Sequence, residues 1–230
     1  MKKYILFIIP LLFAVRCFAQ DTVVKKGWLT ESVIEKYYVL KTDKQTKQGL
    51  YQATINGKIP LASGNYANGK RVGVWHFYDT NGQIIQNFDY ATQTVLYEEP
   101  ITEFTQTKIA YAFDTTFTNA DHVTKPIKPG GRSFGYINYL RLYRFTLDAY
   151  NIDPSQIIAV LEVLVSPGGR LADLKVHIKM NDGEHVTTFS PELFDDDDKV
   201  FIPATINGQP VLCRIFVRCR LTSYGELDLY

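Results

Sequence analysis

The chain has 230 residues and nearly balanced charge, with 25 Lys and Arg against 24 Asp and Glu. This length suits one large domain or two modest ones. A net charge of +1 excludes the strongly basic surface that is typical of nucleic-acid-binding proteins. Phe, Tyr and Trp make up 13% of the residues, which favours β-structure with aromatic cross-strand pairs.

The N-terminus has the pattern of a secretory signal peptide. Lys2 and Lys3 precede an uncharged apolar run from Tyr4 to Val15, which is shorter than the roughly 20 residues needed to cross a bilayer. We predict a signal peptide over residues 1–19, cleaved after Ala19, and therefore a periplasmic or cell-envelope location. An uncleaved anchor is the alternative.

Between about residues 45 and 92 the sequence repeats with a period of 24 residues. Gly49-Leu50-Tyr51, followed by Asn56-Gly57, corresponds to Gly73-Val74-Trp75, followed by Asn81-Gly82. Each unit closes with a tyrosine, Tyr66 or Tyr90. Asn-Gly is a strong hairpin signal because a type I′ turn needs positive φ at both central residues. The pattern predicts an antiparallel β-meander of stacked hairpins.

The repeat resembles the MORN-like repeat of YwqK-type proteins. The resemblance rests on Gly64-x-Tyr66-x-Asn68-Gly69-Lys70 and Gly73-x-Trp75-x-x-Tyr78-x-x-x-Gly82. It implies a β-meander that serves as a binding or spacer surface, without catalysis. We expect residues 33–40 and 95–117 to add strands to the same sheet, which gives a domain over residues 21–118. Two prolines and few large apolar residues make residues 119–129 a predicted linker.

After this linker the apolar pattern changes to a helical period. The apolar residues are spaced by four, three and four: Tyr136, Leu140, Tyr143 and Leu147. This spacing predicts one main helix with Arg141, Arg144 and Asp148 facing solvent. The apolar run 157–165 is typical of a strand buried on both faces, and alternation over residues 174–180 predicts a half-buried strand. Residues 200–221 predict a strand pair, or one long bent strand, around Asn207-Gly208.

Residues 130–230 resemble the C-terminal domain of the energy transducer TonB. Residues 201–211 resemble that family's aromatic-x-Pro-Ala-x-x-Asn-Gly-x-Pro-Val segment, through Pro203, Ala204, Asn207, Gly208 and Pro210. The resemblance implies an α+β domain with an antiparallel sheet, one main helix and a short second helix. It also implies a binding mode in which an extended peptide adds a strand to an exposed sheet edge.

We predict that the last long strand supplies that edge. The candidate partner-binding residues are Val211, Leu212, Arg214, Phe216, Arg218 and Arg220. Cys213 and Cys219 lie about 20 Å apart if this strand is extended, too far for a disulfide with each other. We expect both to be small buried hydrophobic residues, with a thiol that cross-links two chains as the alternative.

We recognise no catalytic constellation in the sequence. None of His76, His122, His177 and His185 belongs to a metal-binding motif, and there is no nucleophile elbow, phosphate loop or dinucleotide fingerprint. The run Asp195–Asp198 lacks the alternation and glycine of a calcium loop. We expect it to be a solvated acidic loop, and cation binding is the open alternative. We therefore predict no catalytic residues, no metal and no cofactor.

These observations predict an exported, non-enzymatic protein of the bacterial cell envelope. It would bind an extended segment of a protein partner, itself an outer-membrane or periplasmic protein, and we predict no nucleic acid or small-molecule substrate. The alternative is a membrane-anchored TonB-type transducer for transport through outer-membrane receptors. The middle of the chain has no Pro-rich spacer of the kind that a transducer needs. A hydrolase with an unrecognised site has no supporting motif.

Overall fold

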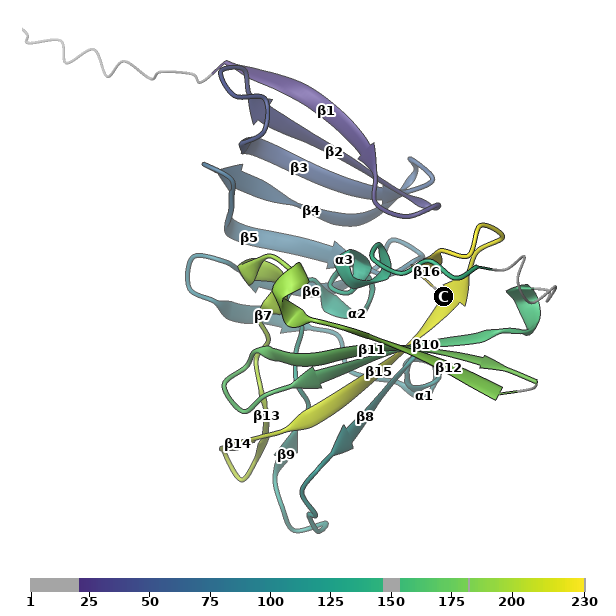
Figure 1. The fold of residues 1–230 in the computed structure, drawn as a ribbon. Coiled ribbons are helices and arrows are strands. Elements are labelled where there is room, and N and C mark those ends of the chain that lie inside the picture. Colours follow the sequence, from purple (N-terminus) through teal and green to yellow (C-terminus); the bar gives the residue numbers. More distant parts are fainter. Residues whose placement is uncertain (1–20, 147–153, 182, 230) are drawn as a thin grey trace, which may run out of the picture.

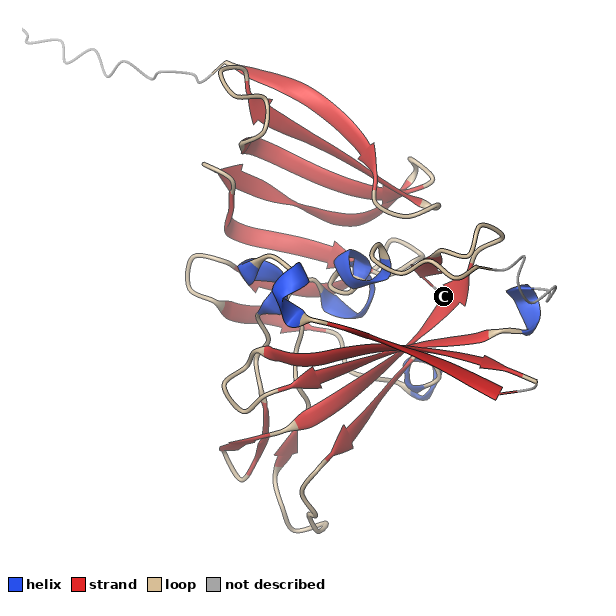
Figure 2. Cartoon of the chain, viewed as in Figure 1, coloured by secondary structure: helices blue, strands red, loops and turns tan. Residues whose placement is uncertain are grey.

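The structure is a computed structural model that describes residues 21–146, 154–181 and 183–229. These residues form two antiparallel sheets, a small third sheet and several short helices, an α+β fold that is mostly β (Figure 2). The predicted signal peptide, Leu147 and Asp148 lie outside the described residues. In the part of the chain that is described, no helix is long and apolar enough to cross a membrane.

The first sheet is a seven-stranded meander in which every strand pairs antiparallel with the next one along the chain. Its strands are β1 (Thr22–Trp28), β2 (Val33–Leu40), β3 (Lys47–Ile55), β4 (Ile59–Ala67), β5 (Lys70–Tyr78), β6 (Ile84–Asp89) and β7 (Thr94–Glu98). Figure 1 shows them side by side in sequence order. The predicted antiparallel meander is confirmed.

Two of the predicted Asn-Gly turns in this sheet have the expected backbone. Asn56-Gly57 and Asn68-Gly69 have positive φ at both residues, as a type I′ turn requires. Asn81-Gly82 differs, because only Gly82 has positive φ. There the Asp79 carboxylate accepts hydrogen bonds from the backbone N–H groups of Asn81 at 2.9 Å and Gln83 at 2.8 Å. A side chain thus replaces the tight two-residue turn.

The 24-residue period is also a structural repeat in the core of the first sheet. The rings of Tyr51 and Tyr66 meet edge to face at 5.5 Å and 64°, and those of Trp75 and Tyr90 do so at 5.7 Å and 68°. Gly64 lies under the indole ring, and a Cβ added to it would be 2.2 Å from Trp75 Cδ2. Gly64 therefore makes room for the tryptophan.

The second sheet has the order β12–β11–β10–β15–β16, with β8 also paired to β15. Its strands are β8 (Ile109–Phe113), β10 (Ile158–Val165), β11 (Leu171–Met180), β12 (Gly183–Phe189), β15 (Cys213–Leu221) and β16 (Leu227–Leu229). The predicted strands at 157–165 and 174–180 are confirmed. The expectation that all of 95–117 joins the first sheet is wrong for β8. Ile109 is buried in the second core, and this burial holds β8 beside β15 instead.

A small three-stranded sheet ties the predicted linker to the motif hairpin. It contains β9 (Val123–Thr124), β13 (Ala204–Ile206) and β14 (Gln209–Val211). Asn207-Gly208 forms the β13–β14 turn with positive φ at both residues. Ile127 bridges to Ile202, so residues 119–129 are paired to the rest of the second unit along part of their length.

The helices are single turns: α1 (Glu103–Gln106), α2 (Gly131–Phe134) and α3 (Ile137–Leu140), with 3₁₀ turns η2 (Pro154–Gln156), η3 (Pro191–Leu193) and η4 (Asp196–Lys199). One main helix from Tyr136 onward was therefore a wrong prediction. The Phe145 N–H donates to the Gly225 carbonyl oxygen at 2.7 Å, and Arg144 bridges to Glu226. These pairings draw the backbone out of helical geometry, although Tyr143 is buried as the pattern predicted.

Helices α2 and α3 lie between the two sheets in Figure 1 and contribute to both cores. Phe134 and Ile137 pack among the buried residues of the first sheet, whereas Tyr136, Tyr139 and Leu140 belong to the core of the second. Full burial of a large apolar side chain stabilises a fold by about 1.5–3 kcal/mol. This short segment therefore joins the two sheets into one packed body.

Candidate functional site

The predicted edge strand, β15, lies inside its sheet. β10 pairs with one side of it from Cys213 to Cys219. On its other side β8 pairs with Cys213–Val217 and β16 with Cys219–Leu221. The prediction that this strand offers an open edge is therefore wrong, because β8, from a distant part of the chain, covers the side that the sequence left unassigned.

The residues predicted to bind a partner are instead engaged within the chain or dispersed. Val211 belongs to β14, Leu212 lies between strands, and Phe216 is half-buried. Arg214 Nε lies 3.1 Å from Glu162 Oε1, and Arg220 Nη2 lies 2.9 Å from Asp228 Oδ2. Arg218 is exposed. These residues therefore do not form an open sheet edge.

The motif residues and the cysteines have structural positions. Ala204 is buried, and Asn207 Nδ2 donates to Asp121 Oδ1 at 2.7 Å. This bond fastens the β13–β14 hairpin, which also contains Gly208 and Pro210 and follows directly after Pro203. Cys213 and Cys219 are both buried and unpaired, as predicted. Burial raises the pKa of each thiol to about 12, so neither is an activated thiolate.

The second sheet has an open edge at β12. This strand pairs with β11 along its whole length, from Gly183 to Phe189, and no strand in the described residues pairs with its other side. Val186 is 45% exposed there. The sequence patterns did not predict β12, although the turn residues Asn181-Asp182-Gly183 and the run Val186-Thr187-Thr188-Phe189 are typical of a hairpin strand.

A groove of about 630 Å³ runs beside this edge. Its wall combines residues of β12 with the segment that follows α3: Leu142, Tyr143, Arg144, Phe145, Thr146, His185, Thr187 and Phe189. The β12 residues in it alternate along the strand, as side chains on one face of a strand do. Three aromatic rings line the groove, together with one imidazole and the side chain of Arg144.

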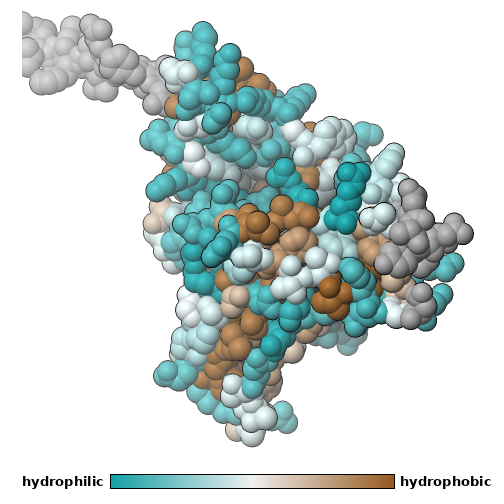
Figure 3. All heavy atoms as spheres, in the orientation of Figure 1, coloured by the Kyte–Doolittle hydropathy of each residue, from teal (hydrophilic) through white to brown (hydrophobic). Residues whose placement is uncertain are grey.

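A second hollow lies between the first sheet and the acidic loop, with a volume of about 710 Å³. Of the four cationic residues that line it, Lys47 and Arg71 occupy equivalent positions of the 24-residue repeat. Leu142 and Leu193, also in its wall, are 44% and 61% exposed. In the view of Figure 3, apolar residues form a patch over the region between the two sheets.

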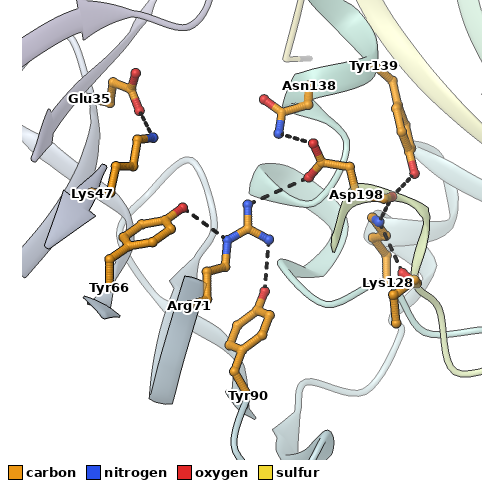
Figure 4. Close-up of polar contacts among 10 residues, drawn as sticks. Glu35, Lys47, Tyr66, Arg71, Tyr90, Lys128, Asn138, Tyr139 and Asp198 are labelled. Atoms are coloured by element: carbon orange, nitrogen blue, oxygen red, sulfur yellow. Dashed lines mark hydrogen bonds and ion pairs between the residues drawn. The ribbon is translucent and has the colours of Figure 1, made fainter. Parts of the chain in front are cut away.

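Arg71 is held in a cage of polar groups (Figure 4). Its Nε and Nη1 donate to the hydroxyls of Tyr66 at 3.3 Å and Tyr90 at 3.2 Å, and Nη2 lies 3.7 Å from Asp198 Oδ1. Burial lowers the pKa of Arg71, but Tyr90, Tyr66 and Asp198 outweigh it and raise the pKa well above its ordinary value. The guanidinium therefore remains charged and links the first sheet to the acidic loop.

Asp198 is the member of the acidic loop that fixes the loop in place. Its carboxylate accepts a hydrogen bond from Asn138 Nδ2 at 2.8 Å, and its carbonyl oxygen accepts from Lys128 and Tyr139 (Figure 4). Asp196, by contrast, is exposed and pairs with Lys199 at 2.9 Å and Arg170 at 3.1 Å. Asp195–Asp198 is thus only in part the solvated loop that we expected.

The described residues contain no cluster of His, Cys, Asp and Glu arranged to hold a metal ion. His177 lies between Glu162 at 2.7 Å and Glu184 at 2.9 Å, and His76 contacts Asn87 at 2.8 Å. Comparison with known proteins adds no identification, since no family model, no curated protein and no solved structure matches this chain.

Proposed function

We propose that this chain is a non-enzymatic, protein-binding protein of the bacterial cell envelope, which takes an extended segment of a partner protein onto the edge of β12. The observation that carries the proposal is the pairing of β12 on one side alone among the described strands. A strand edge of this kind presents unpaired N–H and C=O groups, and an added strand satisfies them.

β12 suits this role better than the opposite edge of the second sheet. That edge is divided between β8, with five residues, and β16, with three, whereas β12 offers seven residues in one run. The first sheet ends at β1, where Lys25 and Lys26 discourage strand addition because charged side chains blunt an edge. β12 is therefore the longest continuous edge of the second sheet.

The groove beside β12 supplies side-chain recognition. Alternate side chains of an added strand would point to the same face as His185, Thr187 and Phe189, where Tyr143 and Phe145 complete the wall. Large apolar or aromatic residues at every second position of the partner fit this surface. Backbone pairing would supply affinity and the groove would supply selectivity.

Site-specific photo-cross-linking in intact cells of the source organism tests this proposal. A photoreactive amino acid at Val186 should give a discrete protein adduct, and one at Phe216 in β15 should give none. Ile84, on the first sheet, is a matched control because it is 44% exposed against 45% for Val186. The proposal fails if position 186 yields no adduct, or if positions 84 and 186 yield the same ones.

Export is the second part of the proposal and rests on residues 1–19. N-terminal sequencing of the protein recovered from the cell envelope should begin at Gln20. A mature chain that still starts at Met1 and sediments with the inner membrane would instead favour the anchored transducer.

A further inference from the structure

The two most exposed large apolar side chains of the described residues line the same pocket. Tyr224 and Trp28 are 66% and 64% exposed, and both lie in the wall of a pocket of about 470 Å³. Trp28 ends β1, and Tyr224 lies in the turn between β15 and β16. Single exposed apolar side chains are ordinary. Two large rings that distant segments bring to one pocket indicate a binding surface.

A buried carboxylate fixes the turn that follows Trp28 against the second sheet. Asp228 in β16 is fully buried. Its Oδ1 accepts a hydrogen bond from Thr30 Oγ1 at 2.6 Å, and its Oδ2 accepts one from the Ser32 N–H at 3.1 Å. Figure 1 shows this β1–β2 turn beside β16. The backbone that carries Trp28 is therefore held in place without a ligand, which lowers the ordering cost of binding.

The turn that carries Tyr224 is fixed by hydrogen bonds to Thr222. This threonine is 1% exposed, and its Oγ1 accepts from the N–H groups of Tyr224 at 3.3 Å and Glu226 at 3.1 Å. Its carbonyl oxygen accepts from the Gly225 N–H at 3.0 Å. Both rings thus stand on ordered turns while most of their surface faces solvent.

The polar groups of the pocket wall are Glu31, Glu226 and Arg141. The nearest oxygens of Glu31 and Glu226 lie 3.8 Å from arginine nitrogens, which is beyond hydrogen-bond distance. A carboxylate has about four acceptor positions, and a guanidinium has five N–H donors. This wall therefore offers both acceptors and donors to a ligand with hydroxyl groups.

The charges in and around the pocket are balanced. Three arginines and three carboxylates line the pocket or belong to the ion pairs of its lining residues: Arg141, Arg144, Arg220, Glu31, Glu226 and Asp228. A balanced set gives no preference for an anion or a cation. The rest of the wall includes the buried leucines Leu29, Leu140 and Leu227. These features favour a neutral ligand with apolar faces and a polar edge.

A sugar ring has this chemistry. The C–H groups on its faces carry partial positive charge and pack on the electron-rich faces of aromatic rings, while the hydroxyls around its edge donate and accept hydrogen bonds. The volume of about 470 Å³ lies within the roughly 300–1,000 Å³ range of small-molecule pockets, which suits a short saccharide.

We propose that this pocket binds a neutral saccharide stacked on Trp28 and Tyr224. The sequence did not predict this ligand class, and the site is separate from the β12 edge. The pocket shares no lining residue with the groove beside β12.

Tryptophan fluorescence of the full chain tests the proposal. The chain has two tryptophans, and Trp75 is fully buried, so added iodide should quench mainly Trp28. The probes are cellobiose, maltose and N,N′-diacetylchitobiose. At least one of them should protect Trp28 from quenching, and the protection should saturate. Tetramethylammonium, a cation that aromatic rings can bind, should give no protection at the same concentration.

Ligand-observed NMR titration then compares variants with the saccharide that protects. Trp28→Ala and Tyr224→Ala should each weaken binding about five-fold or more, because each removes a stacking face. Tyr97→Ala is the matched control, since Tyr97 is an aromatic residue in β7 that is 43% exposed and lies outside the pocket. It should bind as the unsubstituted chain does, and circular dichroism checks that all variants are folded.

Three results would overturn the proposal: no protection by any of the three saccharides, equal protection by tetramethylammonium, or binding by either ring variant that matches Tyr97→Ala. Cross-linking from Val186 reports on the β12 edge alone. The saccharide site and the proposed function can therefore fail independently.

Discussion

The two large sheets differ in how far apart along the chain their paired strands lie. In the first sheet every strand pairs with its successor, from β1 to β7, whereas in the second β15 pairs with β10 and with β8. Successive strands are specified by the short turns between them. A strand that pairs with another strand far away in the sequence has no such local signal. The first sheet was therefore predictable as a meander, and the edge of the second was not.

This difference decides which strand edge of the second sheet is unpaired among the described residues. Sequence patterns correctly identified Cys213–Leu221 as a strand with one buried face, because alternation along a strand is local. Whether that strand is central or at an edge depends on β8. Pairing with β8 moves the available edge to β12, on the far side of β11 and β10.

The largest effect is expected from the glycine beneath the tryptophan of the first sheet. Gly64→Ala places a Cβ about 2.2 Å from Trp75 Cδ2, so the indole or the strand must move. We expect a loss of about 3 kcal/mol in the free energy of unfolding, as for other overpacked cores. Urea unfolding followed by tryptophan fluorescence measures it.

Gly73→Ala is the control, because its added Cβ meets nothing within 4 Å and only the positive φ of 61° is unfavourable. That change should cost about 1–2 kcal/mol. Equal losses for the two variants would contradict the packing role of Gly64.

Because α2 and α3 contribute to both cores, fluorescence and far-ultraviolet circular dichroism should follow one transition. Two transitions would show that the sheets unfold separately.

An intermediate effect is expected at the contact between the two regions. Asp198→Asn removes the charge that faces Arg71, and the side chains of Arg71 and Asp198 are only 11% and 14% exposed. Leaving a largely buried cation without its counter-charge should cost about 2 kcal/mol, less than for a fully buried pair. Urea unfolding gives the value.

Asp196→Asn in the same loop should leave stability unchanged, since Asp196 is 84% exposed and exposed ion pairs contribute little to stability. A loss equal to that of Asp198→Asn would show that the loop acts through its total charge. The contact between Arg71 and Asp198 would then not be what holds the loop.

The smallest effect is a pH dependence from Lys128. Burial lowers its pKa to about 7 from an ordinary value of 10.5, aided by Arg71 and Arg170 and opposed by Asp198 and Asp197. Between these values the unfolded chain carries a proton that the folded chain lacks, so stability rises with pH. Urea unfolding from pH 7 to 8.5 should show this rise, and Lys128→Met should flatten it.

The pH window matters because other buried groups act in the opposite direction. Burial raises the pKa of Glu98 to about 7 from an ordinary value of 4.5, so Glu98 adds a small fall in stability that is almost complete by pH 8. Burial raises the pKa of Cys213 and Cys219 to about 12 from an ordinary value of 9.0, so their effect is a fall in stability that becomes large only above pH 9. Lys128→Met also removes donors from two carbonyl oxygens, so the slope against pH, and not the absolute stability, is the test. An unchanged slope would contradict the assignment to Lys128.

The helix predicted from Tyr136 shows how local and distant interactions compete. Its periodicity placed Tyr136, Leu140 and Tyr143 in the core correctly. The prediction of one continuous helix failed because the backbone at Arg144 and Phe145 pairs with the turn around Gly225. A Cβ at Gly225 would lie 1.9 Å from the Phe145 carbonyl oxygen, so this close approach depends on a glycine that the helical pattern does not include.

The candidate binding surfaces divide in the same way. Residues 183–189 carry a local strand signal, because β-branched residues follow turn residues there. The strand β12 was therefore predictable from the sequence. Its position at an edge, and the grouping of Trp28, Arg141 and Tyr224 around one pocket, required the folded chain. Trp28 ends β1, Arg141 directly follows α3 and Tyr224 lies between β15 and β16.

By itself the sequence determined the meander, its 24-residue repeat and the turns at Asn56-Gly57, Asn68-Gly69 and Asn207-Gly208. All of these depend on residues that are close along the chain. Only the tertiary structure decided which strand is open, which loop is anchored and where a pocket forms. Those features arise from backbone pairing and burial between segments far apart in sequence, for which a local pattern carries no information.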